Sequence, residues 1–261
     1  MQSRNPVLSR SAAFSPGGYA TFSPAAVDQL ETQYAAPPAT GAQTGRMTLD
    51  DVVMKTGILF AVLLATSFVS WKLDSIAVVM VGLVGGLVLG LIISFRQSTN
   101  PALILPYAAL EGLLVGGISN FYQQTANGPI VGQAVIGTLA AFTAMLVLYK
   151  TGVIRATKKF TKMLLIAAVG YLLVGVANLV AAILGVGGGW GFAGTGPGIL
   201  ICVAGVAIAS LFLILDFDMI EQGIRNGAPR EYSWLAAFGL MVTLVWIYLE
   251  ILRLLAILNR R

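Results

Sequence analysis

Several ionisable side chains lie inside long apolar runs of this chain, where a charge is costly. Glu111 falls in YAALEGLLVGGISN, Asp216 and Asp218 in SLFLILDFDMIEQG, and Glu250 and Arg253 in VWIYLEILRLL. A carboxylate at the centre of a membrane-spanning helix costs on the order of 2.5–3.5 kcal/mol, so such residues usually face the protein interior and mark an ion or proton path. Carboxylate oxygens without His or Cys suit calcium, magnesium or protons. These residues therefore predict the handling of cations or protons.

Asp216 and Asp218 differ in depth and in direction. At ~1.5 Å of rise per residue, Asp216 lies roughly 10 Å from the centre of its apolar run, and Asp218 lies about 3 Å further out. Two residues of helix turn a side chain by about 200°, so the two carboxylates point to different sides. We expect Asp216, the deeper one, to face the interior as a calcium ligand or pH sensor. Asp218 and Glu221 are expected to be solvated at the helix end.

Glu111 lies near the middle of its run, and Glu250 and Arg253 lie three residues apart in the last run. The spacing of Glu250 and Arg253 allows a local ion pair on one helix face. Alternatively, one of them reaches Glu111 on a neighbouring helix and forms a charged cluster. The residues alone leave both arrangements open. Because burial and nearby charges change how readily a carboxylate takes up a proton, these groups are also candidates for pH sensing.

The apolar runs identify an integral membrane protein. Of the 261 residues, 57% are hydrophobic and 10% are charged, which is too apolar for an ordinary soluble domain. About 20 apolar residues cross the hydrocarbon core of a bilayer. By that length the chain predicts an all-α membrane bundle of seven transmembrane helices, at 53–71, 76–95, 101–122, 130–149, 163–186, 197–220 and 233–258.

Residues 1–46 differ from the rest of the chain. They are rich in Ser, Ala, Pro, Gly and Thr and lack helical or strand periodicity, which is typical of a disordered segment. The first helix is expected to begin at MTLDDVV, where Thr48 can cap the helix and Asp51 can return the bond. The predicted organisation is a disordered cytoplasmic tail of residues 1–46 and a transmembrane domain of residues 47–261.

The Lys and Arg residues between the runs fall mainly on one side of the membrane. Basic loops stay in the cytoplasm, so the tail is predicted to be cytoplasmic and the NRR end to lie outside, unless the last segment does not fully cross. The net charge of +5 thus reflects topology, and no nucleic-acid partner is expected. The basic residues of the predicted cytoplasmic side are Arg4, Arg10, Arg46, Lys55, Arg96, Lys150, Arg155, Lys158, Lys159, Lys162, Arg225 and Arg230.

Glycines repeat every four residues in two of the runs, at Gly82, Gly86 and Gly90 and again at Gly112 and Gly116. Small residues at this spacing lie on one helix face and let another backbone approach closely. We predict helix packing at these positions. The alternative is a hinge or the wall of a pore.

The sequence argues against an enzyme. It contains no histidine, which excludes a Ser-His intramembrane protease, an HExxH zinc protease and a haem held by histidine. Its single cysteine, Cys202, allows neither an intrachain disulfide nor a thiolate metal cluster and is expected to serve packing. An aspartyl protease would need a second aspartate at the depth of Asp216. No enzymatic activity and no cofactor are expected, and calcium enters only as a transported ion.

Three segments together resemble the bacterial branch of the Bax-inhibitor family, the transmembrane Bax inhibitor motif-containing proteins. They are LEGLLVGGIS around Glu111, LILDFDMI around Asp216 and LEILRLLAIL near the chain end, and the resemblance covers about residues 48–258. It implies a seven-helix bundle with a central last helix, in the bacterial inner membrane. It also implies a pH-sensitive calcium leak controlled by two aspartates, on the sixth and seventh helices. Asp216 matches the first of these, and Glu111 matches the acidic residue of the third-helix motif.

The chain departs from that family pattern at the second aspartate, whose place falls near Thr243 in LMVTLVW. Glu250 lies two turns further, ~10 Å along the axis, and cannot simply replace it. A pair of carboxylates that share one proton is thereby lost, so we expect weaker or shifted pH control. Two functions follow: a passive cation leak through Asp216, Glu111 and Glu250, or a non-conducting regulator. The regulator would bind and restrain a membrane protease or another membrane complex, with the tail as a docking segment.

Overall fold

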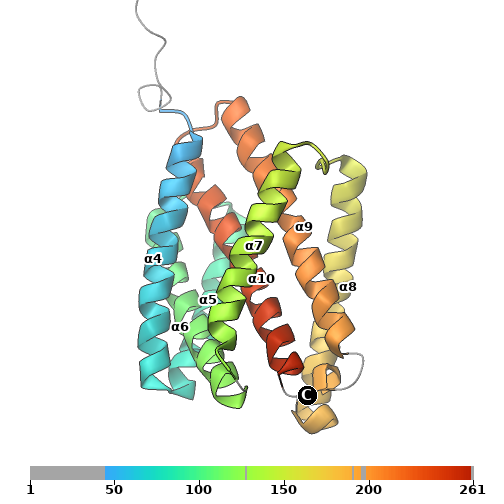
Figure 1. The fold of residues 1–261 in the computed structure, drawn as a ribbon. Helices are drawn as coiled ribbons and strands as arrows, with labels where there is room; N and C mark the ends of the chain where they lie inside the picture. The colour runs from blue at the N-terminus through green and yellow to red at the C-terminus, as the bar shows by residue number, and fades with distance from the viewer. Residues whose placement is uncertain (1–44, 127, 190, 195–197, 260–261) are drawn as a thin grey trace, which may run out of the picture. The chain divides into compact units, whose positions relative to one another are not determined.

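The computed structural model describes residues 45–126, 128–189, 191–194 and 198–259. In these ranges the regular structure consists of seven long α-helices and two short 3₁₀ turns, η2 (Val186–Gly189) and η3 (Gly191–Gly194) (Figure 1). All seven helices are long and apolar enough to cross a membrane, which confirms the predicted all-α fold class. They are α4 (Leu49–Leu73), α5 (Ile76–Arg96), α6 (Pro101–Thr125), α7 (Ile130–Lys150), α8 (Lys158–Ile183), α9 (Gly198–Arg225) and α10 (Tyr232–Leu258).

The first helix begins where the capping residues predict. The Asp51 backbone N–H donates to Thr48 Oγ1 at 3.2 Å, and the Thr48 hydroxyl donates to Asp51 Oδ2 at 2.9 Å. Asp51 is buried and also pairs with Arg230, whose Nη2 lies 2.7 Å from Oδ1. This ion pair fixes the start of α4 to the loop that precedes α10. The predicted tail, residues 1–46, lies outside the described residues except for its last two.

Two helices extend by five residues beyond one predicted end, into charged sequence. The helix α8 begins at Lys158 instead of 163, because Thr157 Oγ1 accepts the Phe160 backbone N–H and caps it there. The helix α9 continues to Arg225 instead of 220. An apolar run ends at its first charged residues, whereas a helix can continue into the interface while its charged side chains reach water. Hydrophobicity alone therefore underestimates both helices.

The last helix, α10, lies in the middle of the bundle, as the family resemblance implies (Figure 1). Half of the residues in its most apolar window are buried, against 6% in α8. It packs against α4, α6, α7 and α9, whereas α5 packs mainly on α6 and α8 on α9. These four helices are therefore the principal neighbours of α10. The C-terminal end of α10 lies at the opposite end of the bundle from the start of α4.

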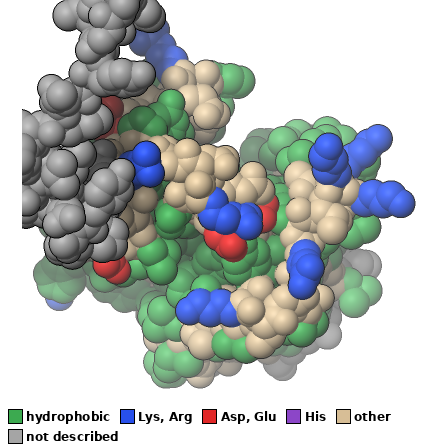
Figure 2. Space-filling view, turned by 90° about the horizontal axis from the view of Figure 1, so that it is seen from above, with side chains coloured by type: hydrophobic (Ala, Val, Ile, Leu, Met, Phe, Trp, Pro, Cys, Tyr) green, Lys and Arg blue, Asp and Glu red, His purple; other side chains and the backbone are tan. Residues whose placement is uncertain are grey.

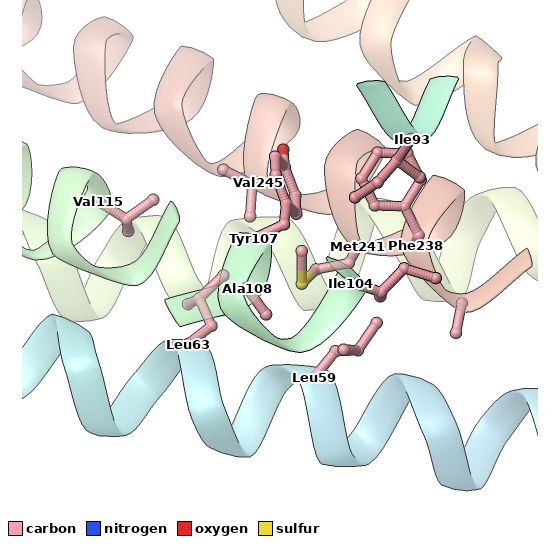
Figure 3. Packing of buried hydrophobic residues seen from close by; sticks show 11 residues of the cluster. Leu59, Leu63, Ile93, Ile104, Tyr107, Ala108, Val115, Phe238, Met241 and Val245 are labelled. Carbon is pink, nitrogen blue, oxygen red and sulfur yellow. The ribbon is translucent and has the colours of Figure 1, made fainter. Parts of the chain in front are cut away.

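The largest apolar cluster among the described residues joins α4, α5, α6 and α10. Figure 3 shows Leu59 and Leu63 between α4 and α6, with Met241 and Phe238 of α10 in the same cluster. The rings of Tyr107 and Phe238 meet edge to face with centroids 4.9 Å apart. Aromatic pairs in this geometry stabilise by more than their buried area alone. Tyr107 and Phe238 also line the cavity that contains Glu111 and Asp216.

Glycines set the distance between α6 and its neighbours. A Cβ atom on Gly112 or on Gly116 would overlap the backbone of α4, at Leu63 and Ser67 respectively. A Cβ on Gly82 of α5 would lie only 2.7 Å from the Leu110 carbonyl oxygen of α6. The backbones are close enough for Ser67 Oγ to donate to the Gly112 carbonyl at 2.9 Å. These three glycines therefore serve close helix packing.

Basic side chains gather at the end of the bundle where α4 begins, here called the basic face. Figure 2 looks onto this end and shows Lys and Arg side chains spread over it. The helices α4, α6, α8 and α10 start at this end, and α5, α7 and α9 finish there. Among the described residues, the opposite half contains only Lys72 and Arg253 as basic residues. The described basic residues of this face are Arg46, Lys55, Arg96, Lys150, Arg155, Lys158, Lys159, Lys162, Arg225 and Arg230.

Candidate ion site

Two of the predicted carboxylates share one cavity. It has a volume of about 510 Å³ and is formed by α5, α6, α9 and α10; we call it the α5–α9 cleft. Glu111 of α6, Asp216 of α9 and Thr243 of α10 all line it. Each lies ~14–17 Å along its helix from the basic face, so the three are at similar depth. The fold thus brings Glu111 into one cleft with Asp216 and Thr243, which lie more than a hundred residues further along the chain.

Asp216 carries the least satisfied carboxylate of the site. Its Oδ2 is buried and has no hydrogen-bond partner among the described residues. The Thr243 side chain lies beside the carboxyl group, and the Thr243 hydroxyl also donates to the Gly239 carbonyl at 3.2 Å. Gly239 faces the carboxylate, since a Cβ there would lie 4.0 Å from Oδ1, in ordinary van der Waals contact. A buried acceptor without a donor is unfavourable unless a ligand, ion or proton completes it.

Glu111 lies across the cleft from the glycine face of α5. The Tyr107 hydroxyl, one turn earlier on α6, is in hydrogen-bonding reach of the Glu111 carboxylate. A Cβ atom on Gly86 would lie 3.4 Å from Glu111 Oε2, and one on Gly90 would lie 3.1 Å from the Tyr107 ring. Gly86 and Gly90 therefore line the cleft, in contrast to Gly82, which serves helix contact.

The cleft opens along the flank of the bundle. Leu83, Leu87 and Leu91 of α5 line it and are between 43% and 62% exposed. Sequence reasoning named Glu111, Asp216 and Thr243 but missed Tyr107 and Gly239. Both lie four residues before a named residue on the same helix, at the spacing that places side chains on one face. That spacing is the signal by which they could have been found.

Glu250 and Arg253 form a separate cluster in the other half of the bundle. Arg253 Nη1 lies 3.3 Å from Glu250 Oε2, so the local pair that the spacing allowed is present. Glu250 also accepts hydrogen bonds from the Tyr171 hydroxyl at 2.7 Å and from Trp246 Nε1 at 3.3 Å. The alternative, a charged cluster with Glu111, is therefore not formed among the described residues. Glu250 instead bonds to Tyr171 of α8 and to its own helix, α10.

The Glu250 cluster fixes the peripheral helix α8. Tyr171 reaches over α9 at Gly205, where a Cβ atom would overlap the Tyr171 hydroxyl and lie 2.9 Å from the Glu250 carboxyl carbon. The Glu250 side chain is only 5% exposed, and a buried carboxylate needs such donors. This cluster joins α8, α9 and α10, and we expect it to contribute to stability.

Tyr171→Phe tests that role. It removes one hydrogen bond to a buried carboxylate, so we expect the free energy of unfolding to fall by about 1.5 kcal/mol. The measurement is the unfolding midpoint of purified protein in detergent. Tyr232→Phe, at a tyrosine that is 46% exposed, is the matched control and should leave the midpoint unchanged. Equal losses in both variants would contradict a specific role for the Tyr171 bond.

The α5–α9 cleft offers few protein ligands for a cation. Among the described residues, no group of three or more His, Cys, Asp or Glu side chains is arranged to hold a metal ion. The cleft offers the carboxylates of Glu111 and Asp216 and the hydroxyls of Tyr107 and Thr243. Calcium takes six to eight oxygen ligands, so water would have to supply the remainder.

These features define a multi-pass, all-α membrane protein with two carboxylates in a cleft between its helices. The family model described as Bax inhibitor 1 like matches residues 5–260. The chain therefore belongs to the Bax inhibitor 1 like family. The match begins at residue 5, so it also covers the tail, for which the sequence motifs gave no counterpart. No curated protein matches the chain.

Proposed function

We propose that this protein is a passive, pH-sensitive pathway for cations, calcium foremost, through the α5–α9 cleft. The observation that carries the proposal is the buried Asp216 Oδ2 without a hydrogen-bond partner among the described residues, in a cavity shared with Glu111. Intramembrane carboxylates of this kind mark ion or proton routes in membrane proteins. Asp216 would bind the ion, with Glu111 on the opposite wall of the cleft.

The ligand set favours a leak over tight binding. Two carboxylates supply enough negative charge to attract a divalent cation, and the remaining coordination sites are left to water. A conducting site must bind an ion well enough to admit it and weakly enough to release it. The Glu250 cluster is not assigned to the route, because Arg253 and Tyr171 already engage that carboxylate.

We place the basic face in the cytoplasm and the protein in the bacterial inner membrane. The support is the concentration of Lys and Arg at the ends of the helices on that face, which the positive-inside rule assigns to the cytoplasm. The tail would then be cytoplasmic as well.

Calcium flux tests the proposal. Purified protein is reconstituted into liposomes, and calcium entry is followed with an enclosed indicator across a pH series. We expect flux above that of empty liposomes. Because Thr243 replaces the second carboxylate, the change in flux with pH should be shallower than two coupled carboxylates would give. Flux equal to that of empty liposomes at every pH would overturn the proposal.

A non-conducting regulator of another membrane protein is the second candidate. The observation in its favour is Thr243, whose hydroxyl donates to Gly239 at the place of the second aspartate. A regulator would be silent in liposomes, and deletion of residues 1–46 should abolish its cellular effect. Flux from the purified protein alone would decide against this candidate.

A further inference from the structure

We propose that a groove between α8 and α9 binds the head group of an anionic phospholipid. The groove has a volume of about 460 Å³ and lies at the basic face, where α8 begins and α9 ends. Lys158, Thr161 and Lys162 line it from α8, and Asp218 and Gln222 line it from α9. It is separate from the α5–α9 cleft, and the proposal does not depend on ion conduction.

The groove is basic at the end of the bundle and apolar further in, as a membrane is polar at its surface and apolar inside. Lys158 and Lys162 lie one turn apart on α8, and Leu165 and Ile166 continue the same face deeper into the bundle. Ile166 lies ~6 Å below Lys162 along the helix. Leu165 is 51% exposed and Ile166 is 64% exposed. A phospholipid whose phosphate lies beside the lysines would thus place its acyl chain against this apolar surface. A free phosphate has no acyl chain and could not make that contact.

The two lysines are available for a phosphate. Among the described residues, neither Lys158 nor Lys162 lies within ion-pair distance of a carboxylate. Arg155 and Lys159 are close in the chain and add positive charge to the same end of α8. Basic pockets between transmembrane helices on the cytoplasmic side are typical binding sites for anionic lipid head groups.

Asp218 is the one acidic side chain in the lining. It opposes an anion, although its carboxylate already accepts a hydrogen bond from the Gln222 side chain. The helix α8 itself has few buried residues, so a lipid in the groove would add contacts that the protein lacks on this side. Removing the Asp218 charge should therefore strengthen binding.

Lipid titration followed by native mass spectrometry tests the groove. The full-length protein in neutral detergent is titrated with phosphatidylglycerol or phosphatidylcholine. We expect preference for phosphatidylglycerol, about thirtyfold weaker binding in Lys158→Gln/Lys162→Gln and stronger binding in Asp218→Asn. The matched control, Lys150→Gln/Lys159→Gln, removes the same charge from the same face outside the lining and should change binding less than about threefold.

The other outcomes overturn the proposal. Equal losses in the two lysine pairs would assign binding to the general charge of the basic face. Equal retention of phosphatidylcholine would show that charge is not recognised. Displacement of the lipid by millimolar inorganic phosphate would identify a free phosphate site. Unfolding midpoints measured in neutral detergent check that every variant is folded, so that a loss of binding reports on the groove.

Discussion

Asp216→Asn should reduce calcium flux by about tenfold or more, a loss of at least ~1.4 kcal/mol in cation stabilisation. A carboxylate 4 Å from a single charge contributes about 4 kcal/mol at the effective dielectric constant of a protein surface. Tenfold is therefore a lower limit. The substitution keeps the shape of the side chain, removes its charge and puts an amide nitrogen in place of one oxygen. The measurement is calcium entry into proteoliposomes.

The same variant should fold at least as well as the original protein. Asp216 Oδ2 has no partner among the described residues, so replacing the acid by an amide removes a poorly compensated charge from the bundle. We expect the unfolding midpoint to stay the same or to rise, which separates lost flux from lost structure. Glu221→Gln, five residues on in α9 and in the solvated last turns, is the control and should conduct normally. Full flux in a well-folded Asp216→Asn protein would remove Asp216 from the pathway.

Gly112→Ala/Gly116→Ala should destabilise the bundle by about 3 kcal/mol. Both added Cβ atoms would overlap the α4 backbone, at Leu63 and Ser67, and backbone cannot move aside as a flexible side chain can. The helices α4 and α6 would have to separate, which also weakens the Ser67 bond to the Gly112 carbonyl. The measurement is the unfolding midpoint in detergent, together with the yield of folded protein.

Gly57→Ala is the matched control on the partner helix. A Cβ at Gly57 would have no atom within 4 Å, so this change should leave stability unchanged or raise it by up to about 1 kcal/mol. A Gly→Ala change is therefore expected to lower stability in α6, where packing decides, and to preserve or raise stability at Gly57, where helix propensity decides. Tolerance of the double variant would show that the close approach of α4 and α6 is not required.

The sequence by itself determined the class of protein. Long apolar runs predict membrane helices because an unpaired backbone cannot enter hydrocarbon, and all seven predicted spans are present. The Thr48 cap was also predictable, because it depends on residues three positions apart. Helix ends in charged sequence, at Lys158 and Arg225, were not, because a helix continues wherever its side chains reach water.

The tertiary structure alone decided which charges meet. Helix periodicity gives the depth and direction of a side chain on its own helix, but it does not say which helices are neighbours. Only the packing of α5, α6, α9 and α10 places Glu111 with Asp216 and Thr243. Likewise, Tyr171 of α8 reaches Glu250 only because Gly205 of α9 has no side chain in its path. Contacts between helices depend on the shapes of both surfaces, and no single helix carries that information.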